Sequence, residues 1–167
     1  MRAFFDAIRA IIYAAGFILL WGWLAVGARQ YDKNVPIEFP SWMSGIGIAI
    51  AAAGGILTLL CIFTFVLRGH GTPAPFDPPR QFVIVGPYRY VRNPMYVGAF
   101  AVILGVSMYL RSFSVLALSL IFCFAASLFV HLYEEPHLRE TFGAPYEAYC
   151  QSVPRWMPRL QRAPRRA

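Results

Sequence analysis

Four stretches of this chain carry no charged residue, and they constrain its fold more than any other feature of the sequence. A helix of about 20 apolar residues crosses the hydrocarbon core of a bilayer, which is roughly 30 Å thick. The third stretch is short, but Asn93 and Pro94 extend it, because proline suits the first turn of a helix. The sequence therefore predicts an all-α integral membrane protein formed by one domain, residues 1–167, with four transmembrane helices at about 10–28, 42–67, 93–110 and 112–133.

The overall composition agrees with a membrane protein. Hydrophobic residues make up 58% of the chain and charged residues only 14%, whereas soluble domains carry about 25% charged residues. The net charge is +7, and the basic residues lie beside the apolar stretches. Anionic lipid headgroups explain this arrangement better than nucleic acid does. The three cysteines follow neither a disulfide framework nor a zinc-binding spacing.

The distribution of arginine predicts the orientation of the spans. Residues 68–92 contain four arginines, and six more follow Val130. Since cytoplasmic loops are enriched in Lys and Arg, we expect both termini and the 68–92 loop on the cytoplasmic side. The first stretch is too long for a signal peptide, so we expect it to be retained. Arginine outnumbers lysine, which favours a bacterial protein of the inner membrane, and a single Arg111 between the last two stretches predicts a tight helical hairpin.

Small residues at helical spacing predict where the helices pack closely. Such residues allow two helix backbones to approach each other in a membrane. One stripe lies in the second span and consists of Gly47, Ala51 and Gly55. The other lies in the third span and consists of Gly98, Ala101 and Gly105. Gly98 is also a candidate to leave room for a ligand.

The tail over residues 134–167 is mixed in character. Arg139, Glu140, Tyr146 and Glu147 indicate a C-terminal cytoplasmic amphipathic helix near the membrane surface. The stretch VPRWMP at 153–158 has proline at both sides and predicts a turn. The basic residues that follow are expected to contact anionic lipid.

Polar residues gather where the third span begins and where the fourth ends. A hairpin of these spans places Arg89, Arg92, Asn93 and Tyr96 near His131, Glu134, Glu135 and His137. Charges at a membrane boundary are costly unless they are paired, so structural ion pairs are one explanation. Glu134 and His137 have the spacing of a di-iron half-site, but no span contains the further carboxylates that such a site needs, so we expect no metal.

Two motifs together resemble a known family. GPYRYVRNPMYVG at 86–98, followed by YEEPHLRETFGAPYEAYCQSVPRWMP at 133–158, is similar to the isoprenylcysteine carboxyl methyltransferase and phospholipid methyltransferase superfamily. The resemblance implies an enzyme that transfers a methyl group from S-adenosylmethionine to a lipid or lipophilic small molecule at the cytoplasmic membrane face. The cofactor-binding residues it implies are Arg80, Gln81, Phe82, Val83, Tyr88, Asn93, Pro94, Met95, Tyr96, Glu134 and Glu135.

Two departures from the family pattern leave the methyl acceptor open. Asn93 stands where the isoprenylcysteine branch has histidine, and Asn-Pro-Met-Tyr resembles the phospholipid branch. His131 lies near the position where the isoprenylcysteine branch has a substrate arginine. A histidine can deprotonate an amine, whereas an arginine fork suits a carboxylate. The candidate catalytic residues are His131, Glu135 and Arg92, and the expected partners are membrane lipids and a lipophilic acceptor.

A different class of function stays open beside the enzyme. The chain could be a small non-catalytic or transport-type protein of four spans, in which the polar cluster only anchors the helices. A carrier of cationic compounds is expected to hold a carboxylate within the membrane. None of the four apolar stretches contains one, which argues against transport.

Overall fold

The computed structural model describes residues 2–34, 39–69 and 83–158, and within these ranges it contains helices and no strand. The predicted all-α class is therefore confirmed. The α-helices are α1 (Arg2–Arg29), α2 (Met43–Thr64), α3 (Pro94–Tyr109), α4 (Phe113–Phe129), α5 (Glu135–Phe142) and α6 (Ala144–Ser152). Single turns of 3₁₀-helix form η1 (Gln30–Asn34) and η3 (Gly86–Arg89), and wider π turns form η2 (Phe65–Gly69) and η4 (Val130–Glu134).

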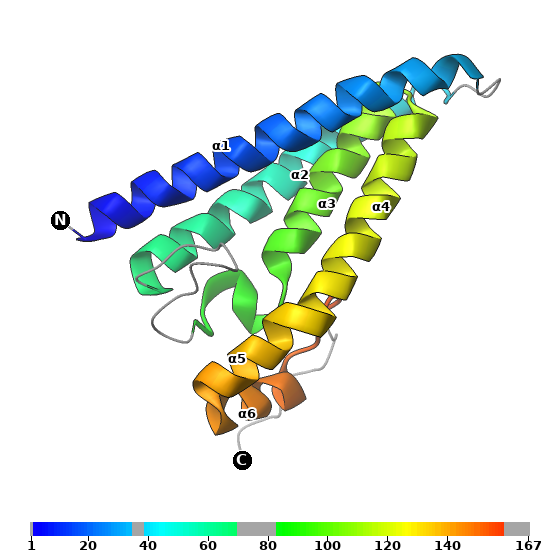
Figure 1. Cartoon of the computed structure of the whole chain (residues 1–167). Coiled ribbons are helices and arrows are strands. Elements are labelled where there is room, and N and C mark those ends of the chain that lie inside the picture. Colours follow the sequence, from blue (N-terminus) through cyan, green and yellow to red (C-terminus); the bar gives the residue numbers. More distant parts are fainter. Residues whose placement is uncertain (1, 35–38, 70–82, 159–167) are drawn as a thin grey trace.

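The long helices converge at one end and diverge at the other. Figure 1 shows α1 running across α2, α3 and α4. These four helices are closest together near the C-terminal end of α1. At the opposite end, α5 continues the direction of α4 and α6 folds back against it. Residues 83–93, which precede α3, and the helices α5 and α6 therefore lie at the wider end of the bundle.

In the part of the chain that the structure describes, three helical segments are long and apolar enough to cross a membrane: Ile8–Asn34, Met43–Arg68 and Phe113–Phe142. They include the first, second and fourth predicted spans. The third prediction is confirmed as an apolar helix, α3, but its 16 residues extend only about 24 Å at 1.5 Å per residue. Whether α3 crosses the bilayer completely stays a prediction. The large apolar side chains on the outside, such as Leu19 and Phe124, suit contact with lipid.

Glycines bring α2 and α3 into close contact, as the small-residue stripes predicted. A methyl group added to Gly105 would lie 2.5 Å from the backbone nitrogen of Ala51, and one added to Gly54 would lie 2.6 Å from the carbonyl oxygen of Gly98. The α2 stripe was wrong at its last member. Gly55 has open space beside it, and Gly54 makes the contact instead, because the stripe advances by three residues in its second step.

The helical hairpin predicted around Arg111 is confirmed. α3 ends at Tyr109 and α4 begins at Phe113, while Arg111 adopts a φ of 52° in the turn. The side chain of Ser112 caps α4 by accepting a hydrogen bond from the Val115 backbone N–H at 3.1 Å. Asp32 adds a second acceptor, because its Oδ1 accepts from the Ser114 N–H at 2.9 Å. Unsatisfied N–H groups at this helix end are thereby paired.

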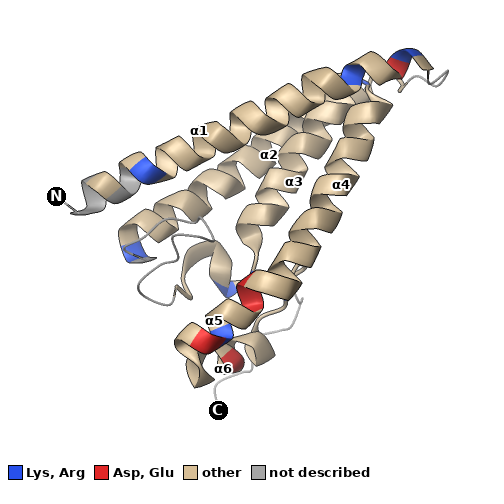
Figure 2. Ribbon diagram, viewed as in Figure 1, with Lys and Arg blue, Asp and Glu red and all other residues tan. Residues whose placement is uncertain are grey.

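The tail forms two short helices where one amphipathic helix was predicted. Gly143 has a φ of 55° and separates α5 from α6; glycine adopts this left-handed conformation without steric cost. The two helices enclose a small cluster in which the buried side chains are Tyr146, Tyr149 and Val153. The face that the pair presents to the membrane stays a prediction. Figure 2 shows acidic and basic residues gathered around α5 and α6, while the middles of α2, α3 and α4 are free of charge.

Candidate functional site

A short irregular segment with bends, residues 153–156, follows α6 at the wider end of the bundle, and we name it the C-terminal strap. Its backbone pairs with the residues just before α3. The Arg92 N–H donates to the Pro154 carbonyl at 2.9 Å, and the Asn93 N–H donates to the Arg155 carbonyl at 3.3 Å. The Asn93 side-chain amide donates to the same carbonyl at 3.3 Å. The strap therefore fixes the entry to α3, where the predicted motif lies.

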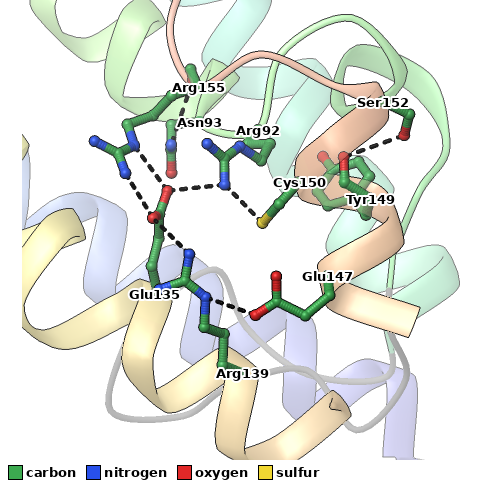
Figure 3. A network of polar contacts seen from close by, with 9 residues as sticks. All are labelled: Arg92, Asn93, Glu135, Arg139, Glu147, Tyr149, Cys150, Ser152 and Arg155. Carbon is green, nitrogen blue, oxygen red and sulfur yellow. Dashed lines mark hydrogen bonds and ion pairs between the residues drawn. The ribbon is translucent and has the colours of Figure 1, made fainter. Parts of the chain in front are cut away.

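Glu135 is the centre of the polar network in Figure 3. The residue is only 2% exposed, and its two oxygens accept from both ends of the Arg155 guanidinium, at 2.8 Å from Nε and 2.7 Å from Nη2. Arg92 Nη1 lies 3.1 Å from the same carboxylate. Arg139 is more distant at 4.0 Å. A carboxylate in a buried position needs such partners, and its hydrogen bonds raise the pKa of Arg155.

Glu134, the neighbouring carboxylate, has a different environment. Its Oε2 accepts a hydrogen bond from the Tyr96 hydroxyl at 2.9 Å, and no other hydrogen bond to it is found among the described residues. The Tyr96 ring packs edge to face against Trp156 of the C-terminal strap, with 6.5 Å between ring centroids. The predicted proximity of the two motifs is confirmed, because Tyr96 meets Glu134 and Arg92 meets Glu135.

Arg92 carries an incomplete set of hydrogen bonds. Its Nη1 contacts both Glu135 and the thiol of Cys150, the latter at 2.7 Å. Its Nε is buried and has no acceptor within the described part of the chain. An unpaired buried donor costs about 1–3 kcal/mol. The guanidinium is thus held in place through Nη1, while its Nε stays unpaired.

An apolar cluster lies directly beside this network. Val83 and Tyr88 are buried in it together with Cys61, and Met95 packs against its edge. The Tyr149 hydroxyl donates to the Tyr88 carbonyl at 2.7 Å. Burial raises the pKa of Tyr88 and of Tyr149 above that of a free phenol. Pro94, the first residue of α3, is fully buried next to this cluster.

The remaining predicted residues are placed as follows. His131 lies on the π turn η4 and is exposed, outside the network around Glu135. His137 stacks on Tyr133, with 6.1 Å between ring centroids. Within the described residues, no group of three or more His, Cys, Asp or Glu side chains could hold a metal ion. Arg80, Gln81 and Phe82 lie outside the described residues.

Sequence reasoning missed Cys150 and Arg155 as members of this site. VPRWMP was predicted to be a turn, and nothing in its composition indicates which carboxylate its arginine meets. A signal was nevertheless present. A buried carboxylate requires a cation, and the short stretch from Glu135 to Arg155 contains one other arginine, Arg139.

Comparison with known proteins places the arrangement in a family. The family described as Phospholipid methyltransferase matches residues 42–145, from the start of α2 into α6. The chain belongs to the phospholipid methyltransferase family. This member of the family is an integral membrane protein with at least three helices of membrane-spanning length in its described residues. The family match ends at Pro145, before Cys150 and the C-terminal strap.

One curated relative aligns over a longer part of this phospholipid methyltransferase family member. The chain is 42% identical over 147 residues to Protein-S-isoprenylcysteine O-methyltransferase of Schizosaccharomyces pombe. The alignment covers 81% of this chain and 61% of the relative. The chain therefore spans about 61% of the length of the curated relative that it matches.

Proposed function

We propose that this protein transfers the methyl group of S-adenosylmethionine to a lipid or lipophilic small molecule at the cytoplasmic membrane face. The observation that carries the proposal is the cluster of polar side chains at the wider end of an otherwise apolar bundle. There, Arg92 has a buried unpaired donor and Glu134 has a free carboxylate oxygen, next to the aromatic ring of Tyr96. Family membership and the name of the curated relative support the same class of reaction.

The described residues fit the chemical groups of S-adenosylmethionine. Arg92 Nε can donate to a carboxylate, and Glu134 can accept from an ammonium or from ribose hydroxyls. The rings of Tyr96 and Trp156, which pack together, can face a cation. When bound, the cofactor supplies an electrophilic methyl group. Val83, Tyr88, Asn93, Pro94 and Met95 are proposed as further contacts beside these groups, together with Arg80, Gln81 and Phe82.

Glu134 and Glu135 have different proposed roles. Glu135 is engaged by two arginines at 3.1 Å or less, so its oxygens are already occupied by partners within the protein. We assign to it the task of holding Arg92. His131 is exposed near the membrane boundary and is the candidate base for an amine acceptor. A carboxylate acceptor would need no base and could be oriented by an arginine.

The acceptor is proposed to reach the site from the bilayer. Withdrawing a lipid chain into water costs about 0.8 kcal/mol per CH₂, and the large apolar side chains on the outside of α2 and α4 suit lipid contact. A phospholipid amine and an isoprenylcysteine-like carboxylate both satisfy this route. The family description favours the first and the name of the relative favours the second.

Replacing Glu134 with glutamine should weaken cofactor binding without unfolding the protein. A hydrogen bond to a charged group contributes about 1.5–3 kcal/mol, which corresponds to a roughly tenfold to hundredfold loss of affinity. Isothermal titration of the purified protein with S-adenosylmethionine measures this. Glu147→Gln is the matched control, because Glu147 is also on the tail but pairs with the exposed Arg139. If the wild type fails to bind at millimolar cofactor, the non-catalytic class is favoured.

Cysteine labelling should place Asn34 and Arg162 on opposite sides of the membrane. The prediction follows from the arginine-rich stretches, which we propose face the cytoplasm. Single cysteines at the two positions, in a background without the native cysteines, are treated with an impermeant maleimide in oriented vesicles. Labelling of both positions from the same side would contradict the proposed topology.

A further inference from the structure

Arg155 joins three parts of the site although it lies outside the stretch that matches the family. Its carbonyl accepts from the backbone and side chain of Asn93. Its guanidinium engages both oxygens of Glu135, at 2.8 and 2.7 Å. A single residue of the C-terminal strap therefore ties the start of α3 to the start of α5.

The contacts continue from Arg155 to Arg92 through one oxygen. Glu135 Oε1 accepts from Arg155 Nε and also lies 3.1 Å from Arg92 Nη1. A two-point pair between a guanidinium and a carboxylate fixes the plane of the carboxylate as well as its distance. The plane of Glu135 in turn sets where Arg92 Nη1 is held, and hence where its unpaired Nε lies.

We propose that Arg155 is a positioning residue, which acts through Glu135 to hold Arg92 in the orientation that binds the anionic group of the ligand. The inference rests on the proposed function for the identity of that ligand. The contact between Arg155 and Arg92 through Glu135 is a property of the protein alone. The role of Arg155 and the identity of the ligand can therefore be tested separately.

Cys150 provides a readout that needs no ligand. Arg92 Nη1 lies 2.7 Å from its Sγ, so displacement of Arg92 changes access to the thiol. Arg155→Ala should increase the rate of Cys150 alkylation by iodoacetamide several-fold, measured on the Cys150 peptide by mass spectrometry. Arg139→Ala is the control, because Arg139 is 4.0 Å from Glu135 and its closer partner is Glu147. An unchanged rate in Arg155→Ala would overturn the proposal whatever the protein binds.

Ligand affinity then separates positioning from a purely structural role. Titration with S-adenosylhomocysteine should show an affinity about tenfold lower for Arg155→Ala, as expected for losing the fixed geometry of one charged hydrogen bond. In an Arg92→Lys background, the same substitution should have little further effect, because the group that Arg155 positions is already changed. A full additional loss in that background would mean that Arg155 contacts the ligand itself.

Arg155→Lys provides the second comparison. Lysine restores a positive charge next to Glu135 but cannot make the two-point pair. We expect thermal stability to recover in this variant while affinity stays low. Joint recovery of stability and affinity would reduce Arg155 to a structural ion pair. If the wild type does not bind S-adenosylhomocysteine, the proposed function fails, and the alkylation rates of Cys150 still decide the role of Arg155.

Discussion

Gly98→Leu should destabilise the bundle strongly. A Cβ at this position would lie 2.5 Å from Thr58 Oγ1 and 2.8 Å from the Gly54 carbonyl oxygen. Since the carbonyl belongs to the backbone of α2, it cannot move aside as a flexible side chain would. Overpacking costs about 1–3 kcal/mol and occasionally more, and here it separates α2 from α3. Thermal unfolding in detergent should show a markedly lower midpoint and a smaller yield of folded protein.

Gly55→Leu is the matched control, since nothing lies within 4 Å of an added Cβ there. It makes the same substitution on α2, the helix that Gly98 of α3 contacts, and should leave the midpoint nearly unchanged. Equal losses from both variants would mean that close α2–α3 contact is not the cause. The sequence also suggested that Gly98 leaves room for a ligand, but in the structure that space is occupied by α2. The position faces Thr58 and Gly54 of α2, so any loss of activity would follow from altered packing.

Glu135→Ala should have the other large effect on stability. The substitution leaves Arg92 and Arg155 without the carboxylate that they share, in a position where Glu135 is only 2% exposed. Removing one member of a buried ion pair costs about 3–5 kcal/mol, because the remaining charge loses its partner. Denaturation in detergent, followed by intrinsic fluorescence or circular dichroism, measures the change in the free energy of unfolding.

Glu147→Ala is the comparison for that variant. Its pair with Arg139 is 3.0 Å long, but the two side chains are 52% and 46% exposed. Exposed pairs contribute about 0–1 kcal/mol. A similar small loss for Glu135→Ala would contradict the view that Glu135 organises the site, and it would also remove the physical basis for the role of Arg155.

Local patterns predicted most of the fold. Long charge-free stretches predicted three helices of membrane-spanning length. Arg111, the single charged residue between the last two stretches, predicted the hairpin. The break at Gly143 was not anticipated, because Arg139 to Glu147 also has the spacing of a continuous helix. Whether Gly54 or Gly55 contacts α3 depends on how the two helices cross. The sequence of α2 alone does not determine that crossing.

The site was predictable where its residues belong to the two helix ends that a hairpin brings together. Arg92, Tyr96, Glu134 and Glu135 meet for this reason. The contribution of Arg155 was not predictable in the same way. It depends on backbone pairing between the C-terminal strap and residues 92–93, a non-local contact without a hydrophobic periodicity. The sequence shows that an arginine is present there but not which carboxylate it meets.

The π turn at Val130–Glu134 has a consequence for how two identical side chains are distinguished. In an α-helix, consecutive residues point about 100° apart around the axis, and a wider turn shifts the angular phase of everything that follows it. Glu134 closes the wide turn and Glu135 begins the regular helix. One carboxylate consequently faces Tyr96 on α3, and the other faces the arginines. Two residues that are adjacent in the sequence thus lie on different faces of the helix. Their different partners follow from the direction of each side chain around the helix axis, because the two residues are of the same type.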